Sequence, residues 1–107
     1  MSATKDAKGD LVPLSANVVE WVYGNAEYVG SVFGTSIPTR RQLHDYYENA
    51  KKEWPRVRLD PANRRHVYEW LKLNDIRGLD YYFPIGNREI WFKNLADAFA
   101  FKLKFGE

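Results

Sequence analysis

Residues 80–93, DYYFPIGNREIWFK, decide the fold class. Aromatic and β-branched residues stand on both sides of Gly86 and Asn87, which together form a two-residue turn. Pro84 has no backbone N–H to donate, so we expect the first strand to lie at a sheet edge, or Pro84 to lie where no ladder bond is required. The stretch therefore predicts an antiparallel β-hairpin.

The strongest helical pattern lies upstream of this hairpin and begins with a capping box. Thr39 and Gln42 have the Thr-x-x-Gln spacing, and the predicted helix runs to about Glu53, just before Pro55. Its apolar positions recur at helical spacing and predict a buried stripe. The stripe consists of Leu43, Tyr46, Tyr47, Ala50 and Trp54.

A second helix is predicted between the first one and the hairpin. Asp60 and Pro61 combine an N-cap residue with a proline in the first turn, and the pattern continues to about Leu73. Val57 and Leu59 precede it as a short extended piece. The buried stripe of this helix is expected to contain Val67, Trp70 and Leu71.

The N-terminal third is harder to assign. Residues 1–11 are polar and small, and we expect a mobile tail. Ser15 offers an N-cap for a helix over 16–23. Residues 24–34 contain three glycines among apolar residues, and they fit either an irregular continuation of that helix or a short strand.

The C-terminal stretch has two possible periodicities. Asn94 can cap a helix that begins at Leu95, with Asp97 in its first turn. Alternating Phe and Leu residues at 99–105 would also suit a strand. We favour a helix because four apolar residues also recur at helical spacing and would form one buried stripe. They are Leu95, Ala98, Phe101 and Phe105.

Taken together, the pattern predicts an α+β fold, with three or four helices packed on a small antiparallel sheet. The 107 residues suit one domain, expected over 12–107, and 45% hydrophobic residues supply its core. The chain has no cysteine, which excludes disulfides and zinc–thiolate sites. No secretory signal or apolar span of membrane length is present, so we expect a cytoplasmic protein that does not bind membranes.

No pattern in the chain is typical of catalysis. The two histidines, His44 and His66, stand in no metal-ligand or nucleophile motif. His44 directly precedes Asp45, and adjacent helix positions point in different directions, so we expect no oriented dyad. The glycines form no phosphate-binding loop. We therefore expect no catalytic residues, no metal and no cofactor.

The basic residues are concentrated in one segment. Residues 40–65 carry eight Lys and Arg against four acids, although the net charge of the chain is only +2. This segment suits either a surface that faces a polyanion or an ordinary solvated helix face. The candidate partner-binding residues are Arg40, Arg41, Arg56, Arg58, Arg64, Arg65 and His66.

The stretch REIWFKNLADAFAFKLKFG, residues 88–106, resembles the ending of many small uncharacterised tailed-bacteriophage proteins. The matching positions are Trp91, Phe92, Asp97, Ala98, Phe101, Lys102, Leu103 and Phe105. The resemblance implies a structural closure in which the rings pack against the sheet, and it implies no activity. It also implies a viral accessory protein in the host cytoplasm.

These observations favour a non-enzymatic binding protein that presents an aromatic and arginine-rich surface to a protein partner, because Tyr, Trp and Arg are enriched at interface hot spots. A nucleic-acid-binding protein that uses residues 40–65 is the alternative. An enzyme whose site is assembled from distant residues is the second alternative.

Overall fold

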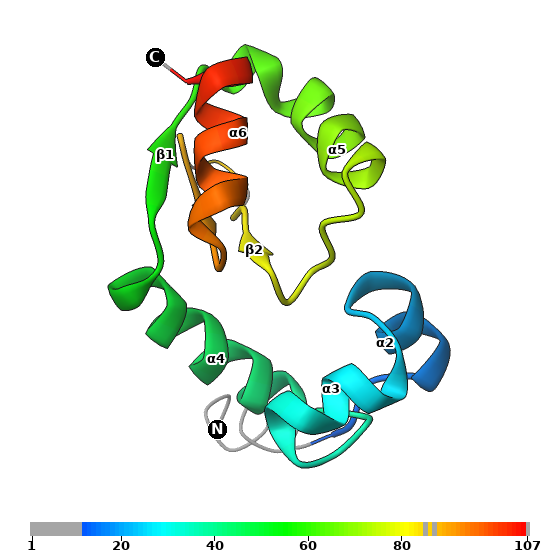
Figure 1. Cartoon of the computed structure of the whole chain (residues 1–107). Coiled ribbons are helices and arrows are strands. Elements are labelled where there is room, and N and C mark those ends of the chain that lie inside the picture. The colour runs from blue at the N-terminus through cyan, green and yellow to red at the C-terminus, as the bar shows by residue number, and fades with distance from the viewer. Residues whose placement is uncertain (1–11, 85, 87, 107) are drawn as a thin grey trace. The chain divides into compact units, whose positions relative to one another are not determined.

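The computed structural model describes residues 12–84, 86 and 88–106 (Figure 1). The chain divides into two compact units, an N-terminal unit of residues 1–48 and a C-terminal unit of residues 49–107. The described residues contain five α-helices and a three-stranded antiparallel sheet, which confirms the α+β class. The predicted tail lies outside the described residues, and the single domain over 12–107 stays a prediction.

The fifth helix, beyond the three or four expected, comes from the segment that the sequence left open. Helix α2 spans Ala16–Val22 and helix α3 spans Ala26–Phe33. The Asn25 side chain caps α3 by accepting a hydrogen bond from the Tyr28 N–H at 2.8 Å. Gly34 ends α3 with a φ of 75°, a left-handed conformation that favours glycine. Residues 24–34 therefore form a separate helix and no strand.

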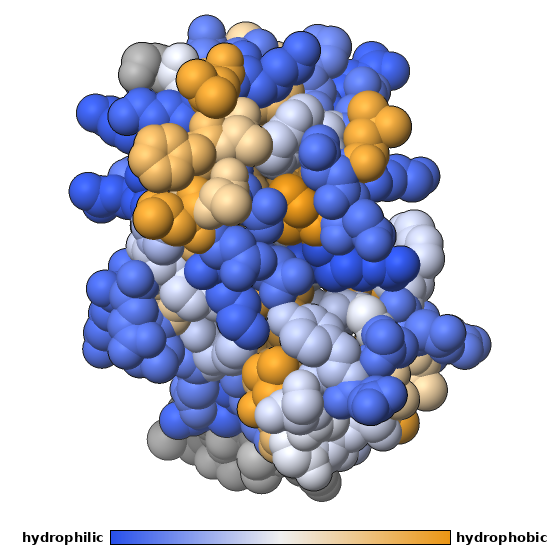
Figure 2. All heavy atoms as spheres, in the orientation of Figure 1, coloured by the Kyte–Doolittle hydropathy of each residue, from blue (hydrophilic) through white to orange (hydrophobic). Residues whose placement is uncertain are grey.

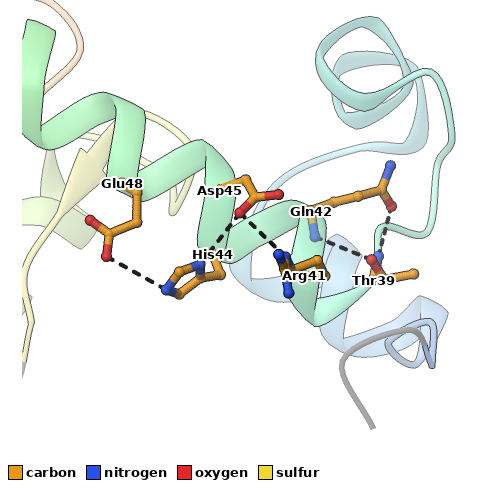
Figure 3. Close-up of polar contacts among 6 residues, drawn as sticks. All are labelled: Thr39, Arg41, Gln42, His44, Asp45 and Glu48. Carbon is orange, nitrogen blue, oxygen red and sulfur yellow. Dashed lines mark hydrogen bonds and ion pairs between the residues drawn. The ribbon is translucent and has the colours of Figure 1, made fainter. Parts of the chain in front are cut away.

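Helix α4, Arg40–Glu53, begins with the predicted capping box. The Gln42 N–H donates to Thr39 Oγ1 at 3.2 Å, and the Thr39 N–H donates to Gln42 Oε1 at 2.9 Å (Figure 3). Ser15 also has the extended backbone of an N-cap ahead of α2, but its side chain makes no cap hydrogen bond. The sequence therefore located both helix starts.

The predicted stripe of α4 is only partly buried. Leu43 and Ala50 are buried, whereas the three aromatic members are half-buried. The half-buried members are Tyr46, Tyr47 and Trp54. In the N-terminal unit, the Tyr46 ring packs between two others, with centroids 5.3 Å from Phe33 and 5.3 Å from Tyr47.

The sheet lies in the C-terminal unit, and its strands are β1 (Arg56–Arg58), β2 (Tyr81–Tyr82) and β3 (Glu89–Phe92). Their order is β1-β3-β2, with both pairings antiparallel. The β2–β3 pairing confirms the predicted hairpin. Strand β2 is an edge strand that ends before Pro84, as expected from the missing donor. Part of the predicted turn, Asn87, lies outside the described residues.

The helices of the C-terminal unit are α5 (Arg64–Leu73) and α6 (Leu95–Phe105). A short 3₁₀ turn precedes α5, and the Asp60 carboxylate caps it by accepting from the Ala62 N–H at 3.0 Å. Both helices and the sheet contribute to one apolar core, and α6 contacts β1 and β3. The core contains Val57, Leu59, Val67, Leu71, Ile76, Phe83, Ile90, Phe92, Ala98 and Phe101.

The C-terminal end of α6 makes a backbone bridge to the residue that follows β1. The Gly106 N–H donates to the Lys102 carbonyl at 2.9 Å, and Gly106 forms an antiparallel bridge with Leu59. A Cβ added at Gly106 would lie 2.7 Å from the Lys102 carbonyl oxygen. Glycine is therefore required here for a close backbone approach.

None of the helices in the described part of the chain has both the length and the apolar character that crossing a bilayer requires.

Candidate docking surface on helix α6

Helix α6 has an inner face that completes the core. Ala98 and Phe101 are buried, and Phe105 packs half-buried beside them. The Phe101 ring centroid lies 5.5 Å from Trp70 and 5.2 Å from Phe92. These edge and tilted contacts are the favourable geometries for aromatic rings. The expectation that Trp70 belongs to the core holds in part, since it is half-buried and packs against this cluster.

The opposite side of α6 is also apolar, but it faces solvent. Leu95, Phe99 and Leu103 expose 62%, 63% and 89% of their surface. Their i, i+4, i+8 spacing places them within about 80° of the helix circumference. Ala96 and Ala100 are exposed beside them. We call these five residues the outer face of α6.

The outer face forms a continuous apolar surface. Figure 2 shows hydrophobic side chains gathered over α6, with hydrophilic residues around them. Single exposed apolar residues are common on proteins, whereas a contiguous patch marks a binding site more often. The outer face is therefore the candidate functional surface of the C-terminal unit.

The exposure of Leu95 corrects the sequence prediction, which placed it on the buried stripe of this helix. At about 100° per residue, Leu95 lies roughly 80° from Phe105 and only about 40° from Phe99. Leu95 therefore belongs to the outer face. The signal that could have identified this face was the second apolar spacing in the helix, Leu95, Phe99 and Leu103, which one buried stripe does not explain.

Most of the predicted partner-binding residues have acidic partners within the chain. The pairs are Arg41 with Asp45 (3.5 Å), Arg56 with Glu89 (2.9 Å), Arg65 with Glu69 (3.8 Å) and His66 with Glu69 (3.9 Å). Exposed pairs of this kind contribute little stability, but they lower the positive field of the segment.

The Arg64 side chain makes contacts within the C-terminal unit. Its guanidinium carbon lies 4.1 Å from the centroid of the Phe83 ring, and Nη2 donates to the Pro84 carbonyl at 3.0 Å. These contacts join the start of α5 to the residues that follow β2. They combine a cation–π interaction with a charge-assisted hydrogen bond.

Arg40 and Arg58 differ from the other candidates, because within the described residues neither makes an ion pair or a polar side-chain contact. Arg58 and Arg56 alternate with buried Val57, so their side chains point away from the core that α5 covers. Residues 64–66 begin α5 itself. The predicted residues of the C-terminal unit therefore lie on two separate elements, β1 and α5.

His44 lies between two carboxylates on the surface of α4. Its Nδ1 is 3.5 Å from Asp45 Oδ1, and its Nε2 is 3.5 Å from Glu48 Oε1 (Figure 3). No oriented dyad was expected from this adjacent pair, although the structure brings the two side chains to 3.5 Å. Both distances are at the limit of a hydrogen bond, and the three side chains are largely exposed. No group of three or more possible metal ligands occurs among the described residues.

Comparison with known proteins adds no relative, because no protein-family model, no curated protein and no solved structure matches the chain.

Proposed function

We propose that this protein is a small, non-enzymatic binding protein that docks a protein partner on the outer face of α6. One observation carries the proposal: α6 packs Phe101 fully into the core and leaves Leu95, Phe99 and Leu103 exposed on its other side. An apolar face of a helix is normally covered, so a second, exposed apolar face is a candidate for a binding surface. Burying these three side chains against a partner would supply the apolar centre that protein interfaces have.

The shape of the outer face suits a helix of the partner. Leu95, Phe99 and Leu103 form a ridge of residues four apart, and Ala96 and Ala100 form a low row beside it. Ridges of this spacing pack into the grooves of another helix, and small residues allow the two backbones to approach. An extended peptide would use an open sheet edge instead, and the two edge strands, β1 and β2, have only three and two residues.

The experiment is a comparative affinity purification from extract of the cells in which the protein is made, with quantitative mass spectrometry. The test variant carries Phe99→Asp and Leu103→Asp. The matched control carries Leu73→Asp, because Leu73 is 85% exposed on α5 and lies outside the outer face. We expect proteins retained by the parent to be retained by the control and lost by the test variant. Equal recovery with the test variant and the parent would contradict the proposal.

The phage origin implied by the C-terminal resemblance stays a prediction. Under that origin the partner would be a host or viral protein.

Nucleic-acid binding through residues 40–65 is the alternative, and Arg40 and Arg58 favour it because, in the described part of the chain, they are the candidate cations with neither an ion pair nor another polar or ring contact. The test measures affinity for duplex DNA against salt concentration. Each productive phosphate contact contributes about −0.9 to the slope of log affinity against log salt. Under this alternative, Arg58→Ala and Arg40→Ala each flatten the slope by about 1. We expect binding so weak that neither substitution changes the slope measurably.

A further inference from the structure

We draw no further inference here: the strongest candidate, the apolar outer face of α6 with Leu95, Phe99 and Leu103 exposed, is the docking surface already described, and nothing in the structure shows whether a second copy of this chain or another protein covers it.

Discussion

The inner and outer faces of α6 carry similar side chains in opposite surroundings. Phe101 on the inner face is fully buried against three other aromatic rings, whereas Phe99 on the outer face is mostly exposed. Burial of a large apolar side chain contributes to folding only where the fold itself covers that side chain. The comparison teaches that the apolar content of a helix separates into a part used for folding and a part available for binding.

The largest effect should come from the inner face. Phe101→Ala removes a ring from the centre of the core and leaves a cavity among Trp70, Phe92 and Phe105. We expect a loss of about 4 kcal/mol in the free energy of unfolding, measured by urea denaturation. Unchanged stability would mean that the inner face does not hold α6 on the sheet.

A smaller effect should come from the anchor at the end of α6. Gly106→Ala places a Cβ 2.7 Å from the Lys102 carbonyl oxygen, so the backbone must shift. We expect a loss of about 2 kcal/mol by urea denaturation, in the range for overpacked sites. Gly30→Ala is the matched control: Gly30 lies within α3, its added Cβ would meet nothing within 4 Å, and alanine is the better helix former. If both variants lost stability equally, close approach at Gly106 would not be the cause.

The smallest effect on stability should come from the outer face. Phe99→Ala removes a ring that is mostly in water, so the unfolding free energy should change by no more than about 0.5 kcal/mol. In the comparative affinity purification, the same variant should retain less of the proteins that the parent retains. A large loss of stability would show that Phe99 belongs to the fold and would remove the distinction between the two faces.

Local signals made much of the fold predictable. Three predicted features depend only on residues that are close together in sequence, so their local chemistry determines the geometry. They are the capping box at Thr39 and Gln42, the cap at Asp60, and the hairpin of β2 and β3. The pairing of β1 with β3 was not predicted, because it joins residues about thirty positions apart. A strand of three residues is also too short for its sequence to indicate which strand it pairs with.

The candidate site was less predictable. Sequence reasoning selected cations by their density along the chain, but i, i+4 carboxylates pair with two of them, Arg41 with Asp45 and Arg65 with Glu69. Leu95, Phe99 and Leu103 were passed over because apolar residues are assigned to a core by default. Only the position of the helix against the sheet separates the stripe that is covered from the stripe that is not.

The strand order of the C-terminal unit has a consequence for how that unit opens. Strands β1 and β2 have no bond to each other, and every ladder pair of the sheet includes β3. Partial opening that releases β3 therefore breaks both strand pairings of the sheet at the same time. In amide hydrogen exchange, the backbone N–H groups of β3 should exchange only when the entire unit unfolds, and their exchange rates should report the global stability of the unit.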